Sequence, residues 1–164
     1  MNPIVRPASA NDVRQMSELL NQIIDLGGTT ALTETIRPLD ITNWMARHAG
    51  RNAWHVAESQ IGDILGFQFI EPHVDLPPDA ADIATFVRVG TIKLGIGSKL
   101  FSATEQAARD LEYVWLNATI RADNTGGLTY YQSRGFRTYH QDDNVKLGNG
   151  LQVSKISKRY DLWD

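Results

Sequence analysis

A change of pattern over residues 82–101 constrains this chain more than any other feature. Residues 83–89 alternate, with β-branched side chains at the odd positions, which is typical of a strand. Glycines follow at positions 90, 95 and 97, and Gly97 opens a segment in which apolar residues have helical spacing. Because the first turn of a helix has unpaired N–H groups and a partial positive charge, this joint of strand, glycine turn and helix predicts an anion site.

Three kinds of phosphate-binding loop could account for these glycines. A dinucleotide fingerprint needs a third glycine where the chain has Leu100, and a Walker loop needs Lys and Ser/Thr where it has Ile96 and Gly97. The third kind is the acyl-CoA loop of the GNAT N-acetyltransferase superfamily, which residues 94–100 resemble, with Ile92 in place of the family's usual Gln or Arg. Taken alone, the stretch is equally compatible with an ordinary glycine turn.

A second motif occupies residues 113–136. Residues 113–119 alternate and predict a strand, with Val114, Leu116 and Ala118 on one face and Tyr113 with Trp115 on the other. Asp123 or Asn124 can then cap a short helix that a glycine ends. The spacing resembles the second GNAT signature, carried here by Asn124, Gly127, Tyr131, Gly135 and Phe136. With both signatures in order, the chain is identified as a member of the GNAT superfamily over essentially its whole length.

Composition bounds the remaining possibilities. A chain of 164 residues predicts a single domain spanning residues 1–164, and a net charge of -3 argues against nucleic acid as a partner. The sequence has neither a long apolar run nor the parts of a signal peptide, so we expect a cytoplasmic protein without membrane contact. The lack of cysteine excludes an acyl-cysteine mechanism, and the spacing of His48, His55 and His140 predicts no metal site.

The remaining pattern predicts an α/β (α+β) domain with the GNAT acyl-CoA N-acyltransferase fold, a mixed and mostly antiparallel sheet with helices on both faces. The helices are expected from Ser9 to the glycines at 27 and 28, and from Asp40 to Gly50. The other strands are expected at residues 4–8, 53–58, 61–71, 137–141 and 151–160, with loops at residues 29–39 and 72–79.

Three further stretches resemble the branch of phosphinothricin and methionine sulfoximine acetyltransferases. They are Thr29-Thr30-Ala31, the acidic residue that enters the central strand, and Lys146-Leu147-Gly148. The chain departs from the branch at Asp82-Ile83, where the branch has Glu-His, and at Leu32-Thr33, where it has aromatic residues. The resemblance implies a homodimer and a small primary amine as acceptor, with amino acids and their analogues included. Both departures fall in the acceptor pocket, so the acceptor itself stays open.

The GNAT resemblance also implies roles for individual residues. Tyr131 would be the general acid that protonates the leaving thiolate, with Tyr130 as the neighbouring alternative. Asp82 would remove the amine proton through water, unless it is a solvated strand-end charge and Glu71 or His73 serves instead. Residues expected to bind acetyl-CoA are Val87, Arg88, Val89, Leu94, Gly95, Ile96, Gly97, Ser98, Lys99, Asn124 and Tyr131. Residues expected to bind the acceptor are Thr30, Ala31, Glu71 and His73.

These observations predict an acetyl-CoA-dependent N-acetyltransferase that transfers the acetyl group directly in a ternary complex. Two alternatives stay open at this point. One is an acyl-CoA-binding module without catalysis, and the other is an acetyltransferase that acts on a protein N-terminus or lysine.

Overall fold

The computed structural model describes residues 2–91 and 95–163, and within these ranges it contains one sheet with the strand order β1-β2-β3-β4-β5-β7-β6. The strands are β1 (Ile4–Pro7), β2 (Ala53–Glu58), β3 (Ile64–Glu71), β4 (Ala80–Val87), β5 (Trp115–Arg121), β6 (Arg137–Lys146) and β7 (Gln152–Asp161). The helices are the 3-10 helix η1 (Ala10–Asp12), α1 (Val13–Leu26), α2 (Pro38–Ala46), α3 (Ile96–Asp110) and α4 (Thr125–Ser133). No helix in the described ranges is long and apolar enough to cross a membrane.

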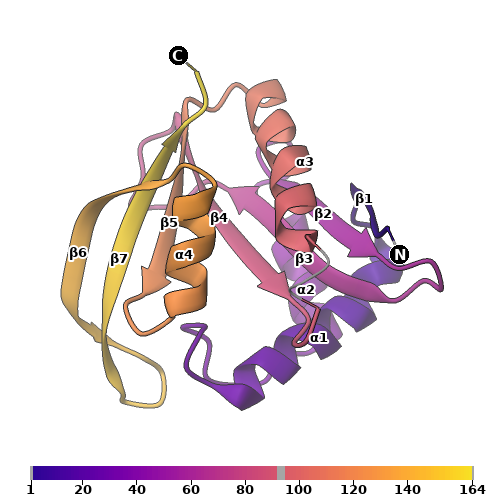
Figure 1. Ribbon diagram of the computed structural model, residues 1–164, viewed down its shortest axis with the longest axis horizontal. Helices are drawn as coiled ribbons and strands as arrows, with labels where there is room; N and C mark the ends of the chain where they lie inside the picture. Colours follow the sequence, from indigo (N-terminus) through magenta and orange to yellow (C-terminus); the bar gives the residue numbers. More distant parts are fainter. Residues whose placement is uncertain (1, 92–94, 164) are drawn as a thin grey trace.

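Helices cover both faces of this sheet. Figure 1 shows α3 and α4 in front of the sheet and α1 and α2 behind it. The apolar side of α1 packs with Ile41 of α2 against Trp54 and Phe67 of the sheet, which forms one core layer. On the other face Phe101 of α3 and Tyr131 of α4 pack around the apolar residues of β5. The predicted fold class is therefore confirmed.

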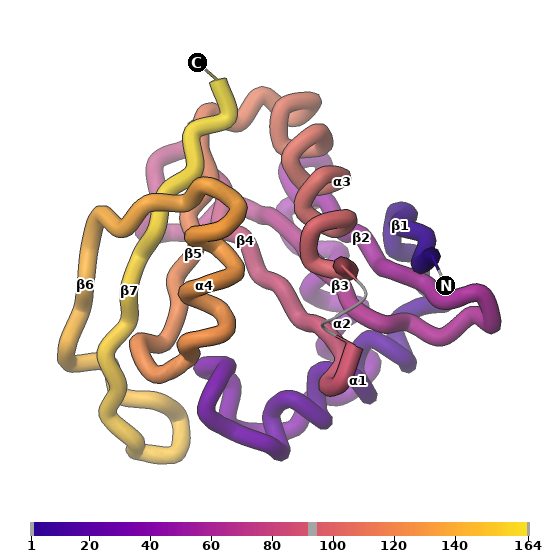
Figure 2. The backbone as a smooth tube through the Cα atoms, viewed as in Figure 1, coloured from indigo at the N-terminus to yellow at the C-terminus, as the bar shows by residue number. Residues whose placement is uncertain are grey.

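The sheet changes character between β4 and β5. In the described ranges this pair is parallel and all other strand pairs are antiparallel. The parallel register runs from Ala80 opposite Trp115 to Asp82 opposite Asn117 and includes no later pair, although both strands continue. Figure 2 shows the two strands diverging toward the lower part of the view. The sheet is thus open at its centre.

Several predicted boundaries are wrong, including those of β3, which begins at Ile64, and of β6, which continues to Lys146. The second helix begins at Pro38 and not at Asp40, because proline fits the first helical position and the Asp40 carboxylate accepts a hydrogen bond from the Arg37 N–H at 2.7 Å. The helix also ends at Ala46, four residues before Gly50. The central strand ends at Val87, and Val89 lies beyond it with 57% of its surface exposed.

The predicted faces of β5 also need correction at its start. Tyr113 lies before the strand and is fully buried, because its hydroxyl donates to the Arg51 carbonyl at 2.6 Å and its ring joins the core layer under α3 and α4. Val114, predicted to share a face with Leu116, is 41% exposed, whereas Leu116 is fully buried. The strict alternation therefore begins only at Trp115.

Candidate active site

A cavity of about 710 Å³ opens where β4 and β5 separate. Its walls come from the end of α1, the segment between α1 and α2, strand β4 and the residues after it, the turn into α3, strand β5, helix α4 and strand β7. We call residues 27–37 the α1–α2 segment. Because these parts lie on both faces of the sheet, the cavity passes through the gap between the strands.

One wall of this cavity is the free backbone edge of β4. The Arg88 N–H donates to the Leu65 carbonyl of β3 at 2.8 Å, and the Asp79 carbonyl accepts from the Val114 N–H on the β5 side at 2.7 Å. Hydrogen-bonding groups alternate along a strand, so the odd-numbered residues of β4 direct theirs away from β3. Ile83, Thr85 and Val87 therefore present N–H and C=O groups to the cavity, an edge suited to an extended amide ligand.

The glycine turn forms the second wall. Helix α3 begins at Ile96, with Gly95 as its N-cap at φ 68°, a left-handed conformation that favours glycine. Gly95, Gly97 and Ser98 line the cavity. The Ile96 side chain packs in the core, and the Lys99 Nζ donates to the Pro3 carbonyl at 3.1 Å. For these two residues only the backbone can serve the predicted role, and Leu94 lies outside the described residues.

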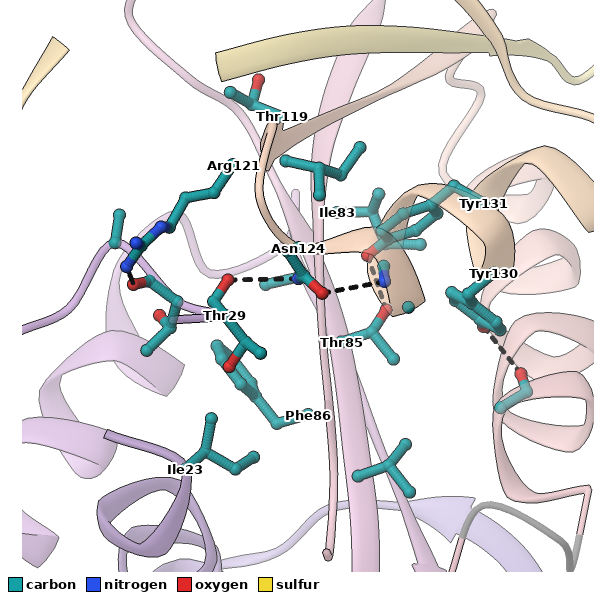
Figure 3. Close-up of a pocket in the computed structure, with 18 of the residues that line it drawn as sticks. Ile23, Thr29, Ile83, Thr85, Phe86, Thr119, Arg121, Asn124, Tyr130 and Tyr131 are labelled. Atoms are coloured by element: carbon teal, nitrogen blue, oxygen red, sulfur yellow. Dashed lines mark hydrogen bonds between the residues drawn. The ribbon is translucent and has the colours of Figure 1, made fainter. Parts of the chain in front are cut away.

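Gly97 also allows α3 and α4 to approach each other. A Cβ atom at this position would lie 2.7 Å from Cε1 of Tyr130, closer than carbon atoms pack. The Tyr130 hydroxyl donates to the Gly97 carbonyl at 2.7 Å (Figure 3). The glycine is therefore required by packing inside the protein as well as by any ligand at the turn.

Arg134, at the C-terminal end of α4, was missed by the sequence reasoning. Its Nη1 donates to the Ser98 Oγ at 2.9 Å, and it lines the cavity beside Gly97. Its Nε is buried and has no hydrogen-bond partner among the described residues. A guanidinium with a spare donor next to a helix N-terminus fits a pyrophosphate group. Its place directly before Gly135 in the second signature was the available signal.

Tyr131 lies at the middle of the cavity wall. It is 7% exposed, and its Oη is 2.7 Å from the Thr85 Oγ1 on β4 (Figure 3). Burial raises the pKa of the Tyr131 phenol, and the charge of Asp82 raises it further. The phenol is thus protonated at neutral pH. Tyr130, the neighbouring alternative, also lines the cavity, but its hydroxyl proton is engaged by the Gly97 carbonyl.

Asp82 lines the cavity on the α1 side of the sheet. It is half-buried, and Asn117 donates from Nδ2 to the Asp82 Oδ1 at 2.9 Å. The Tyr139 hydroxyl in turn donates to the Asn117 Oδ1, which orients the amide. Burial raises the pKa of the Asp82 carboxyl, while the hydrogen bond from Asn117 opposes the shift. Asp82 is therefore a partly desolvated and oriented carboxylate, a chemistry suited to a base and different from that of a solvated strand end.

The α1–α2 segment closes the same side of the cavity, where Thr30 and Ala31 line it as predicted for acceptor residues. Asn21 binds the backbone of this segment at Ile36, and two further side chains hold it at Thr29 and Thr30. Arg121 donates to the Thr30 carbonyl at 3.1 Å, and Asn124 donates to the Thr29 carbonyl at 3.1 Å (Figure 3). The same Asn124 side chain caps α4 by accepting from the Gly127 N–H at 2.9 Å. Asn124 thus combines the predicted capping with a tether that the sequence did not indicate.

Glu71 and His73, the other predicted acceptor residues, line a different and more open hollow with Arg47. The Glu71 carboxylate accepts two hydrogen bonds from Arg47, at 2.8 and 2.7 Å. The His73 Nδ1 accepts from the Asp75 N–H at 3.1 Å. Both residues are near enough to affect the pKa of Asp82, but the structure does not bring them into the main cavity.

Lys155 of β7 is a second charged residue that the sequence reasoning missed. It lines the cavity, and its charge is close enough to lower the pKa of Asp82. It forms no salt bridge with a carboxylate in the part of the chain that the structure describes. No local pattern marks it, because its position depends on the insertion of β7 between β5 and β6.

The site can now be set beside known proteins. No family model matches the chain. Phosphinothricin N-acetyltransferase of Streptomyces coelicolor (strain ATCC BAA-471 / A3(2) / M145) is 28% identical over 169 residues, which cover 98% of this chain and 91% of that protein. YwnH of Bacillus subtilis (strain 168), a provisionally named phosphinothricin acetyltransferase, is 24% identical over 160 residues, with 96% and 94% covered.

A solved structure gives the corresponding comparison of folds. A GNAT superfamily phosphinothricin acetyltransferase from Sinorhizobium meliloti, in complex with AcCoA, superposes with a TM-score of 0.88 at 15% identity. The superposition covers 98% of this chain and 89% of that one. The fold and the two relatives support the class of protein expected from the sequence, an N-acetyltransferase of the GNAT superfamily. Within the superfamily it lies near the phosphinothricin acetyltransferase branch, which confirms the resemblance found in the sequence.

Proposed function

We propose that this protein transfers the acetyl group of acetyl-CoA to the primary amine of a small molecule, directly and in a ternary complex. The observation that carries the proposal is the unpaired edge of β4, which faces a cavity with a glycine turn at one wall and Asp82 with Tyr131 at the others. An acyl-CoA-binding module without catalysis would need the edge and the turn. It would not need a buried phenol and an oriented carboxylate beside them.

The residues present fit acetyl-CoA as the acetyl donor. The N-terminus of α3, Ser98 and Arg134 would hold the pyrophosphate, and the edge of β4 would pair with the amides of the pantetheine arm. The co-substrate supplies an acetyl group on a thioester. The structure of the Sinorhizobium meliloti relative in complex with AcCoA supports this choice.

The chemistry needs two proton transfers, one from the acceptor and one to the leaving thiolate. Asp82 would take the ammonium proton, directly or through water, because a partly desolvated carboxylate is a stronger base than a solvated one. A backbone N–H of the β4 edge would stabilise the oxyanion. Tyr131 would donate the proton to sulfur from the opposite face of the sheet. Direct transfer accords with the lack of cysteine in the sequence.

The charges on the acceptor side favour a zwitterionic acceptor of the amino-acid class. Asp82 attracts an ammonium group, and Lys155 lines the same cavity with its own positive charge. A small molecule that carries an amine and a carboxylate would match both. The phosphinothricin acetyltransferase names of the two relatives are consistent with this class.

A screen of free amines tests the proposal. Release of CoA from acetyl-CoA is followed with amino acids, amino-acid analogues, simple amines and an N-terminal peptide. Rapid release with a small amine, and none with the peptide, is the expected result. Turnover of the peptide alone would favour the protein acetyltransferase alternative, and CoA binding without turnover of any acceptor would favour the binding module.

Lys155 should determine the affinity for the acceptor carboxylate. We expect Lys155→Met to raise KM for an amino-acid acceptor roughly 10- to 100-fold with little change in kcat, because a hydrogen bond to a charged group contributes about 1.5–3 kcal/mol. The matched acceptor is the same molecule with a carboxamide in place of the carboxylate, whose KM should not change. An equal increase in KM for both acceptors would contradict the assignment.

Asp82 should make both activity and stability depend on pH. Because burial raises its pKa, the folded protein binds this proton more tightly than the unfolded chain does. Ionisation of this buried carboxylate therefore lowers the free energy of unfolding. The loss develops as pH rises from the ordinary aspartate pKa through the raised pKa of Asp82. We expect Asp82→Asn to gain stability relative to the wild type over that interval, and the limb on which activity rises with pH to move or weaken.

Urea denaturation from about pH 4 to about pH 7 measures this difference in the free energy of unfolding. Asp79→Asn is the matched control, since Asp79 is exposed and lies just before β4. A difference between Asp82→Asn and the wild type that stays constant with pH would show that Asp82 titrates as an ordinary surface carboxylate.

Homodimerisation is proposed from the family resemblance, and a cytoplasmic location from the lack of a long apolar run in the sequence. Light scattering at micromolar concentration tests the dimer.

A further inference from the structure

We propose that Gln68 and Thr85 form a hydrogen-bond chain of fixed direction, which turns the hydroxyl proton of Tyr131 into the cavity. The chain connects four side chains across the β3–β4 pair and α4, and it ends on a carbonyl of α3. It deepens the proposed function and rests on it, because it gives Gln68 and Thr85 a role in positioning the acid.

The direction of the chain is set at its far end. The Tyr130 Oη is 2.7 Å from the Gly97 carbonyl, and a carbonyl oxygen can only accept, so Tyr130 donates its single proton there. The Tyr130 Oη is also 3.0 Å from the Gln68 amide. With its own proton engaged, Tyr130 must accept from Gln68. The side-chain amide of Gln68 is therefore oriented with its NH₂ group, and not its carbonyl oxygen, toward the Tyr130 hydroxyl.

The same NH₂ group reaches the next residue. The Gln68 Nε2 is 2.8 Å from the Thr85 Oγ1, so its second hydrogen is donated there. Gln68 is fully buried, and its Oε1 has no hydrogen-bond partner among the described residues. An unpaired buried oxygen has a free-energy cost. The amide is nevertheless held in this orientation by the two hydrogen bonds that it donates.

The hydrogen bonds of Thr85 determine which way the Tyr131 hydroxyl proton points. Its Oγ1 accepts from Gln68, and its remaining described partner is the Tyr131 Oη at 2.7 Å. If Tyr131 donated to Thr85, the Thr85 hydroxyl proton would have no acceptor in the described part of the chain except the Tyr130 oxygen, which already accepts from Gln68. If Thr85 donates to Tyr131, its own groups are satisfied and the Tyr131 proton points into the cavity. The second arrangement places the acidic proton where a thiolate would leave.

The direction of the Thr85–Tyr131 hydrogen bond also matters after Tyr131 has given its proton to the thiolate. The amine nitrogen bonds to the acetyl carbon, the carbon–sulfur bond breaks, and the thiolate takes the Tyr131 proton. The ammonium loses two protons on its way to the amide, and one of these restores Tyr131 through solvent while the other is released. During this interval the Thr85 hydroxyl donates to the Tyr131 phenolate and stabilises it. Thr85 is thus a positioning residue that acts through Tyr131.

Free CoA provides a readout that needs no acceptor and no turnover. If Tyr131 donates to sulfur, the bound thiol ionises at lower pH than free CoA does, which the ultraviolet absorbance of the thiolate records. We expect Thr85→Val to lose most of this shift and to lower kcat roughly tenfold with the KM for acetyl-CoA unchanged. Thr85→Ser restores the hydroxyl and should restore both properties.

Gln68→Met tests the chain from its other end and serves if Thr85→Val does not fold. It should reduce the thiol shift, because the Thr85 oxygen would no longer accept from Gln68 and could accept the Tyr131 proton instead. A wild-type thiol shift in both Thr85→Val and Gln68→Met, with CoA bound, would overturn this inference and leave the proposed function standing. Failure of the wild-type protein to bind CoA in calorimetry would overturn both.

Discussion

Replacement of Tyr131 by phenylalanine is expected to lower turnover by roughly 10²- to 10⁴-fold, the usual contribution of a general acid. The ring stays, so its packing in the core layer of α3 and α4 is kept and CoA affinity should hold. The proton that the thiolate needs is lost. Steady-state kinetics with the best acceptor from the amine screen gives the turnover, and calorimetry with CoA gives the affinity.

Tyr130→Phe is the matched control, because it removes the neighbouring hydroxyl from the same helix. This hydroxyl bonds the Gly97 carbonyl, so its loss should lower stability and weaken CoA binding more than it slows the chemistry. An inactive Tyr130→Phe beside a fully active Tyr131→Phe would show that the general acid is Tyr130.

Gly97→Val should have the second large effect, a loss of CoA binding together with a loss of stability of about 1–3 kcal/mol, the usual cost of overpacking. The added side chain would collide with the Tyr130 ring and would also block the approach of a pyrophosphate to the backbone of the turn. Denaturant titration and calorimetry with CoA measure the two losses. The sequence alone suggests that this substitution would affect only the ligand. The contact with Tyr130 means that it must affect the packing of the protein as well.

A double variant separates the two causes. Tyr130→Ala relieves the collision, so combining it with Gly97→Val should recover part of the stability and none of the CoA affinity. Recovery of both would mean that Gly97 serves only the packing of α4 on α3. Ser102→Val, at an exposed position of the same helix, controls for the cost of a β-branched residue in α3.

Local patterns in the sequence predicted those parts of the fold that depend on interactions between residues close together in the chain. The strand, glycine turn and helix around Gly97 follow from periodicity and from the conformational freedom of glycine, and the cap at Asn124 follows from its short polar side chain. Tyr113 was placed on the wrong face because its burial depends on the Arg51 carbonyl, which is distant in the sequence. No window around Tyr113 contains that partner.

The residues of the candidate site also fall into two groups, those in local sequence motifs and those placed by distant contacts. Tyr131 and Gly97 lie in motifs that the sequence displays, and both line the cavity. Lys155 could not be assigned, since it reaches the cavity through the strand order, whereas Arg134 was missed although it stands next to Gly135 of the second signature. Glu71 was predicted as an acceptor residue and an alternative base. A nearby Arg47 holds it in a separate hollow, and one residue's local pattern cannot reveal its ion-pair partner.

The tethers of the α1–α2 segment have a consequence for how the acceptor could be changed. Arg121 and Asn124 hold the segment by the carbonyl oxygens of Thr30 and Thr29, and every amino acid supplies such an oxygen. Neither of these two hydrogen bonds uses a threonine side chain, although the Thr30 Oγ1 accepts from the Leu32 N–H at 3.2 Å within the segment. New residues there could reshape the acceptor end of the cavity while the anchored backbone and the helix that Asn124 caps stay in place, so one scaffold can be refitted for different amines.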